Sequence, residues 1–142
     1  MKKDEIYYYY SVDDDLQLWV IRCGRDKVLF FDGLSFLFIT RSEWMDYKRK
    51  NDIRNLRGIF TIDSSKIKEL RSELFDEFYL LLEDDSIIEI YTAPNGSLIT
   101  QQIRYIPSDS KVITPNGLNI YDSILESFKE AELYENIDIK KW

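Results

Sequence analysis

Residues 87–106 read IIEIYTAPNGSLITQQIRYI, and this stretch decides the fold class. Two runs rich in β-branched and aromatic residues flank the dipeptide Asn95-Gly96. Asn-Gly favours a tight hairpin turn, because both residues tolerate the positive backbone φ angles that such a turn requires. The stretch therefore predicts an antiparallel hairpin that turns at Asn95-Gly96.

The strand-like pattern continues on the amino-terminal side of this hairpin. Residues 78–83 (FYLLLE) form an apolar run that Asp84-Asp85-Ser86 joins to the hairpin, so residues 78–106 predict a three-stranded meander. Further strands are expected where apolar and polar residues alternate between polar turns: Ile6–Val12, Leu16–Cys23, Val28–Phe31, Leu34–Thr40 and Ile59–Ile62.

Two or three helices are expected between these strands. Thr40 and Glu43 have the spacing of a capping box and predict a helix that ends near Asn51. Asn119 is a candidate cap for a final helix with an apolar side. A third helix is expected after residues 63–65 from the helical spacing of Ile67, Leu70, Leu74 and Phe78, although the end of this run also fits a strand. The sequence thus predicts a single α+β domain over residues 1–142, with a largely antiparallel sheet of hairpins.

The composition excludes several kinds of catalytic and metal site. The chain contains no histidine, which excludes Ser-His-Asp and Cys-His nucleophile systems and His-ligated zinc. Its one cysteine excludes an intrachain disulfide and a multi-cysteine metal site. The acidic runs at 13–15 and 83–85 lack the ligand spacing of a calcium loop, and no glycine-rich phosphate loop is present. We therefore expect no cofactor, no bound metal and no enzymatic activity.

Charge is unevenly distributed along the chain. The net charge is −7, and residues 72–142 hold five Lys/Arg against fourteen Asp/Glu. Residues 40–71 are locally basic, with nine Lys/Arg against five Asp/Glu. Trp44 and Tyr47 come just before the basic run, which is Lys48-Arg49-Lys50. An acidic protein repels nucleic acid and attracts basic partners, so the basic run is expected to be a solvated helix face. With no apolar stretch long enough for a membrane span and no signal peptide, we expect a cytoplasmic protein that binds neither nucleic acid nor membrane.

In size, acidity, lack of histidine and aromatic richness, the chain is similar to bacterial immunity proteins, although the similarity involves no motif. Such proteins neutralise a cognate toxin domain, often a nuclease with a basic active site. The similarity implies a small acidic binding protein that inhibits a basic, nuclease-type toxin domain. An alternative is a hydrolase that works through carboxylates, with or without a metal, for which the candidates are Glu89, Asp76 and Glu77.

The candidate partner-binding residues are mainly acidic. Asp122, Glu126 and Glu130 follow the i, i+4, i+8 spacing that places side chains on one face of a helix. The other acidic candidates belong to two predicted turns: Asp13, Asp14, Asp15, Asp84 and Asp85. Tyr7 and Tyr9 are included because tyrosine is common at interfaces, although we expect the run of four tyrosines to belong mainly to the sheet and core.

Overall fold

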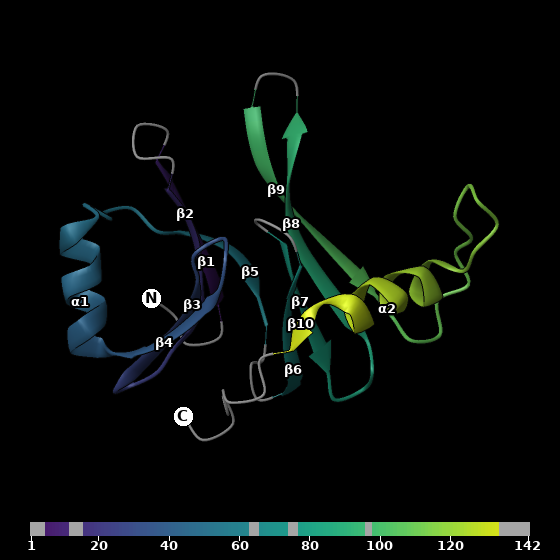
Figure 1. Cartoon of the computed structure of the whole chain (residues 1–142), viewed down its shortest axis with the longest axis horizontal. Helices are drawn as coiled ribbons and strands as arrows, with labels where there is room; N and C mark the ends of the chain where they lie inside the picture. The colour runs from purple at the N-terminus through teal and green to yellow at the C-terminus, as the bar shows by residue number, and fades with distance from the viewer. Residues whose placement is uncertain (1–4, 12–15, 63–65, 74–76, 96–97, 134–142) are drawn as a thin grey trace. The chain divides into compact units, whose positions relative to one another are not determined.

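The computed structural model describes residues 5–11, 16–62, 66–73, 77–95 and 98–133. Within these residues the fold is α+β, with two five-stranded antiparallel sheets and two α-helices (Figure 1). The chain divides into two compact units, each containing one sheet and one helix, and the boundary lies between Ser65 and Lys66. The predicted α+β class and its antiparallel hairpins are confirmed, and the single domain over residues 1–142 stays a prediction.

The sheet of the first unit has the strand order β4-β3-β2-β1-β5. Its strands are β1 (Glu5–Ser11), β2 (Leu16–Cys23), β3 (Lys27–Phe31), β4 (Phe36–Thr40) and β5 (Arg57–Thr61). Because Tyr8 pairs with Trp19 and Trp19 pairs with Phe31, one face of the sheet carries a continuous row of aromatic rings. Ring centroids 5.2 and 5.6 Å apart place these side chains in direct contact.

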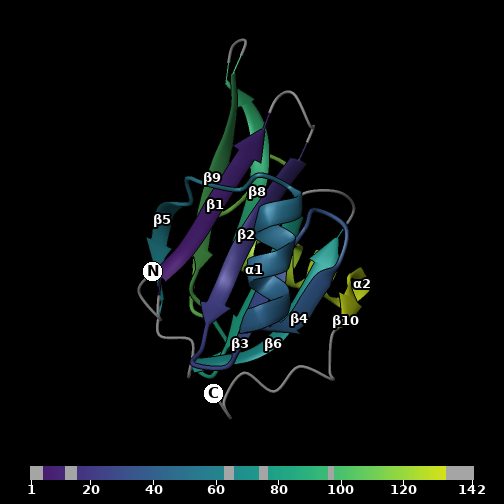
Figure 2. The same ribbon diagram turned by 90° about the vertical axis from the view of Figure 1, so that its left-hand side faces the viewer.

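Helix α1 (Arg41–Lys50) covers the opposite face of this sheet, as Figure 2 shows. The predicted capping box is confirmed: Thr40 Oγ1 accepts a hydrogen bond from the Glu43 N–H, and a Glu43 carboxylate oxygen accepts one from the Thr40 N–H, both at 3.1 Å. The helix ends at Lys50, and Asn51 is its C-cap, which confirms the predicted end near Asn51. Trp44 is buried and packs on Phe30, with ring centroids 4.9 Å apart, so it fixes the helix to the sheet.

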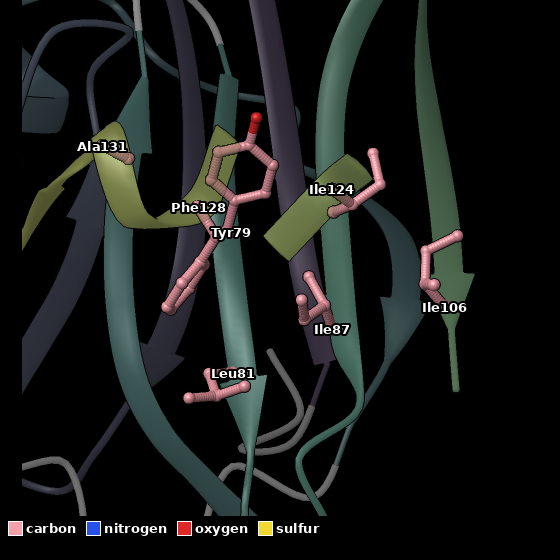
Figure 3. Close-up of a cluster of buried hydrophobic side chains, with 7 residues drawn as sticks. All are labelled: Tyr79, Leu81, Ile87, Ile106, Ile124, Phe128 and Ala131. Carbon is pink, nitrogen blue, oxygen red and sulfur yellow. The ribbon is translucent and has the colours of Figure 1, made fainter. Parts of the chain in front are cut away.

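The sheet of the second unit has the strand order β10-β6-β7-β8-β9. Its strands are β6 (Ile67–Glu73), β7 (Glu77–Leu82), β8 (Ile87–Asn95), β9 (Leu98–Ile106) and β10 (Glu132–Leu133). Helix α2 (Ile120–Glu130) lies across one face, and its side chains Ile124 and Phe128 are buried against β7, β8 and β9 (Figure 3). The strand residues of this cluster are Tyr79, Leu81, Ile87 and Ile106.

The helix predicted from Ile67 onwards is wrong, because residues 67–73 form strand β6. Ile67 and Leu70 are both buried, and their separation of three residues suggested a helical face. In the structure, a register shift between Ile67 and Glu69 adds one residue to β6 relative to β7. This β-bulge places Ile67 opposite Leu82 and Leu70 opposite Leu80, so both residues face the same side of the sheet. Leu74 lies outside the described residues.

The predicted strand runs on either side of Asn95 and of Asp32-Gly33 pair as antiparallel hairpins, with small differences in position. Strands β8 and β9 pair up to Asn95 and Leu98, so Asn95 is the last paired residue of β8, and Gly96 lies outside the described residues. Between β3 and β4 the loop spans residues 32–35, two residues more than predicted. There an Asp32 carboxylate oxygen accepts hydrogen bonds from the N–H groups of Leu34 and Ser35, and Gly33 adopts a φ of 94°.

Candidate functional site

The turn between β7 and β8 presents two exposed carboxylates in a fixed geometry. An Asp84 carboxylate oxygen accepts hydrogen bonds from the N–H and the hydroxyl of Ser86, the first at 3.0 Å. Asp85 adopts a φ of 67°, a left-handed conformation that Asp tolerates better than most residues. The two hydrogen bonds from Ser86 hold the pKa of Asp84 below its usual value, so this carboxylate is charged at neutral pH.

The start of α2 lies beside this turn. The Asn119 side chain caps the helix by accepting hydrogen bonds from the N–H groups of Tyr121 and Asp122, as the sequence predicts. The hydroxyl of Tyr121 then donates a hydrogen bond of 2.7 Å to the backbone carbonyl of Asp85. This contact joins the β7–β8 turn to the first turn of the helix.

Three carboxylates therefore surround Tyr121. Burial raises the pKa of Tyr121, and the negative charges of Asp85, Asp122 and Asp84 raise it further. Two lysines offset part of this charge: Lys68 Nζ lies 3.4 Å from an Asp85 carboxylate oxygen, and Lys66 acts on Asp84. We call Asp84, Asp85 and Asp122 the acidic corner.

The acidic face predicted for the last helix is exposed along α2. Asp122, Glu126 and Glu130 are each solvent-exposed, and Glu126 forms an exposed ion pair with Lys129 at 3.7 Å. Because exposed pairs at this spacing contribute only a few tenths of a kcal/mol, about 0.3–0.5, Glu126 remains available to a partner. Of the predicted acidic residues, the structure thus brings Asp122 to the β7–β8 turn, and Glu126 and Glu130 follow along α2. Asp13, Asp14 and Asp15 lie outside the described residues.

Tyr7 and Tyr9 lie on the face of the first sheet that α1 covers. Both are partly buried against the cluster that contains Leu18, Val20 and Trp44. The Tyr7 hydroxyl donates to a Glu5 carboxylate oxygen at 3.0 Å, and the Tyr9 hydroxyl lies 3.5 Å from the backbone oxygen of Asp52. Tyr7 and Tyr9 therefore belong to the sheet and its core. That they also bind a partner stays a prediction.

An apolar loop between β9 and α2 is a feature that sequence reasoning missed. Val112, Ile113 and Leu118 are 60, 58 and 57% exposed. The loop is nevertheless ordered by its own hydrogen bonds: Thr114 N–H donates to Leu118 O, Gly117 N–H to Thr114 O and Ile120 N–H to Val112 O, at 2.7–2.9 Å. The Asn119 amide also donates to Ser110 O at 2.7 Å, which fixes the loop to the residue that caps α2.

The loop could have been recognised from its composition. Aliphatic residues lie on both sides of the turn Pro115-Asn116-Gly117. A short loop that leaves the body of the protein exposes such residues if no other segment covers it. Gly117 has a φ of 79°, a conformation that glycine adopts without strain. We call residues 110–118 the apolar loop.

The carboxylates proposed for a hydrolase are engaged in other contacts or lie outside the described residues. Glu89 is buried, and its carboxylate accepts a hydrogen bond of 2.5 Å from Arg104, which balances its charge. Glu77 accepts a hydrogen bond from the Tyr79 hydroxyl at 3.1 Å, and Asp76 lies outside the described residues. Among the residues that the structure describes, no three His, Cys, Asp or Glu side chains are grouped closely enough to hold a metal ion.

The aromatic residues beside the basic run on α1 pack on the sheet: Trp44 is buried and Tyr47 is half-buried. Trp44 is 1% exposed and Tyr47 packs on Phe30, with ring centroids 4.9 Å apart. Binding of single-stranded nucleic acid relies on exposed aromatic rings that stack on bases, so neither ring is placed for that contact. Arg49 forms an exposed ion pair with Asp46 at 3.5 Å, as expected of a solvated helix face.

Comparison of the chain with protein-family models, with curated proteins and with solved structures finds no match. Neither helix in the described ranges is long and apolar enough to cross a membrane.

Proposed function

We propose that this chain is a small acidic binding protein of the immunity class, which neutralises a basic toxin domain of nuclease type. The observation that carries the proposal is the hydrogen bond from the Tyr121 hydroxyl to Asp85 O. Through this contact, acidic residues from a turn and from a helix that are distant in the sequence form one surface. A surface of this kind complements the basic groove with which a nuclease binds its substrate.

The charges of the acidic corner serve mainly to speed association with the partner. Exposed carboxylates attract a basic surface over a distance of about one Debye length, ~8–10 Å at moderate salt, and their effect falls as salt is added. On this proposal Asp84, Asp85 and Asp122 raise the association rate, and Glu126 and Glu130 extend the same field along α2.

The apolar loop contributes to affinity by a route other than charge, because a partner can bury its side chains. Large side chains that are held rigidly in water contribute strongly when a partner buries them, because little conformational freedom is lost on binding. Val112, Ile113 and Leu118 are such side chains, and the Asn119 side chain connects their loop to the first turn of α2 through hydrogen bonds with Ser110 O and the Asp122 N–H. On this proposal the apolar loop is the hydrophobic centre of the interface, and the acidic corner is part of its polar rim.

The test requires a candidate basic toxin domain, and the product of a gene neighbouring that of this chain is the first choice. Co-expression of the wild-type chain should restore growth to a host that the toxin domain kills. The binding variant is Asp84→Asn/Asp85→Asn/Asp122→Asn, in which asparagine retains the local hydrogen-bond acceptors. The control variant, Asp26→Asn/Asp46→Asn/Asp52→Asn, changes the net charge from −7 to −4 in the same way but at exposed sites in the first unit.

Association rates measured at two ionic strengths separate the two parts of the surface. The binding variant should associate more slowly than the control variant, with a flatter salt dependence. An Ile113→Ser/Leu118→Ser variant should associate at the normal rate and dissociate faster. If the neighbouring toxin domain does not bind the wild-type chain, or if the binding and control variants behave alike, the proposal is wrong.

A further inference from the structure

Strand β9 is the terminal strand of its sheet and differs from the other terminal strands. Within the described ranges β8 is its one sheet neighbour, so one edge of β9 is not used by this sheet. Strand β9 has nine residues, whereas β4 and β5 have five each and β10 has two. A long terminal strand presents a row of backbone donors and acceptors that another strand can pair with.

Two features that protect such an edge, a β-bulge and residues such as proline or lysine, are missing from strand β9 as the structure describes it. The pairing of β8 with β9 runs from Ile87↔Ile106 to Asn95↔Leu98 without a register shift. By contrast, β5 at another sheet edge pairs with β1 through a register shift, and β-bulges of this kind disfavour edge-to-edge pairing. Residues 98–106 contain no proline, glycine or lysine and one charged side chain, Arg104.

The one charge on the strand is already compensated. Arg104 Nη2 donates to the buried carboxylate of Glu89 at 2.5 Å, and the guanidinium also lies over the ring of Tyr91, 5.9 Å from its centroid. Tyr105, on the same strand, leaves 52% of its surface exposed. A regular strand with a single, compensated charge and a partly exposed aromatic residue has the composition that favours pairing with another strand.

We propose that β9 pairs antiparallel with β9 of a second copy of this chain, joining the two sheets across a twofold axis at Gln102. The occupant is a second copy because an antiparallel strand pair is symmetric, so one strand can serve as both partners. With the axis at Gln102, each Arg104 lies opposite position 100 of the other copy, so the two arginines do not face each other. No like-charged residues on the two strands oppose one another in this register.

The dimer should be weak and concentration-dependent. Pairing of one strand buries less surface than the roughly 1,200–2,000 Å² of a stable interface. Each copy also carries a net charge of −7, so the copies repel each other and added salt should strengthen the dimer. This salt response is opposite to the one expected for binding of a basic toxin domain, so failure of either proposal is recognisable separately.

The experiment measures mass by sedimentation velocity over a wide range of protein concentrations. The wild-type chain should shift from monomer to dimer as concentration rises, and amide hydrogen exchange in residues 101–106 should slow in parallel. Gln102 is exposed, so Gln102→Lys and Gln102→Glu should both fold. Each variant alone places like charges at the axis and should stay monomeric, whereas an equimolar mixture of the two should form the dimer.

Thr61→Lys is the matched control, since it adds a charge to β5, which is a terminal strand of the other sheet. This variant should dimerise like the wild type. A wild-type chain that stays monomeric at every concentration would overturn the proposal. So would Gln102 variants that dimerise alone as strongly as they do in the mixture.

Discussion

The hydroxyl of Tyr121 donates a hydrogen bond to the backbone carbonyl of Asp85, 36 positions earlier in the chain. This contact connects the first turn of α2 with the β7–β8 turn and so positions the acidic corner. It also gives a surface tyrosine a structural role that its neighbours in the sequence do not indicate.

Removing this hydroxyl should loosen the helix from the turn. Tyr121→Phe keeps the ring but loses the donor, so we expect the free energy of unfolding to fall by about 1 kcal/mol. Urea denaturation measures the change. Tyr105→Phe is the control, because Tyr105 is 52% exposed, and it should leave stability unchanged.

Alkaline pH should act through the same contact. The pKa of Tyr121 is raised in the folded chain by burial and by the carboxylates of Asp85, Asp122 and Asp84. The folded state therefore holds the phenolic proton more tightly than the unfolded state, whose tyrosine pKa is about 10. This stabilisation is fully present below about pH 10 and is lost as pH rises through the folded-state pKa. Denaturation curves above pH 10 should show a shallower loss of stability in Tyr121→Phe than in the wild type, and identical pH profiles would contradict the assignment.

The capping box of α1 offers a test in the first unit. Thr40→Ala removes the acceptor for the Glu43 N–H and should destabilise the fold by about 1 kcal/mol. Ser42→Ala changes a neighbouring exposed residue outside the cap and should have an effect within about 0.5 kcal/mol. Hydrogen bonds from Thr40 lower the pKa of Glu43, so the contribution of this carboxylate is present above its unfolded-state pKa and is lost as pH falls through the lower folded-state value. Helix content measured by circular dichroism between neutral and acidic pH should therefore fall less in Glu43→Gln.

The ion pair between Glu89 and Arg104 should respond asymmetrically to its two deletions. The Glu89 side chain is 5% exposed, whereas that of Arg104 is 41% exposed and can turn to solvent. Arg104→Leu leaves a buried carboxylate without its cation and should cost about 3–5 kcal/mol, while Glu89→Leu should cost less. The double variant Glu89→Leu/Arg104→Leu should recover much of the loss. Thermal unfolding of the three variants completes the cycle. Equal losses of stability in the two single variants would contradict the assignment of Glu89 as the buried member of the pair and Arg104 as the exposed one.

Neutralising the acidic face of α2 should affect binding more than folding. The variant Asp122→Asn/Glu126→Gln/Glu130→Gln removes three exposed charges, each of which contributes little to stability. On the proposed function, its association with a basic toxin domain should be slower and less dependent on salt than that of the wild type. Stopped-flow measurements at low and moderate ionic strength provide the rates. If rates and salt dependence do not change, the partner contacts a different surface, and Tyr7, Tyr9 and the basic run on α1 become the next candidates.

Features that depend on hydrogen bonds between neighbouring residues were predictable from the sequence. Thr40 and Glu43 are three residues apart, and Asn119 caps residues two and three positions later, so the helix starts follow from local chemistry alone. The β8–β9 hairpin follows in the same way, because its two strands are joined by a short turn. The acidic face of α2 required the helical period and nothing else.

Other features depend on contacts between segments that are far apart in the chain. A β-bulge against β7 makes a strand of residues 67–73, and the spacing of Ile67 and Leu70 alone is equally compatible with a helix. Strand β5 pairs with β1 rather than with a neighbour in sequence, and the division of the strands into two sheets follows from such pairings. The acidic corner exists because Tyr121 reaches a turn 36 residues away. Local pattern fixes which residues can share a face, but the free energy gained by burial and pairing between distant segments selects one arrangement among those that the pattern allows.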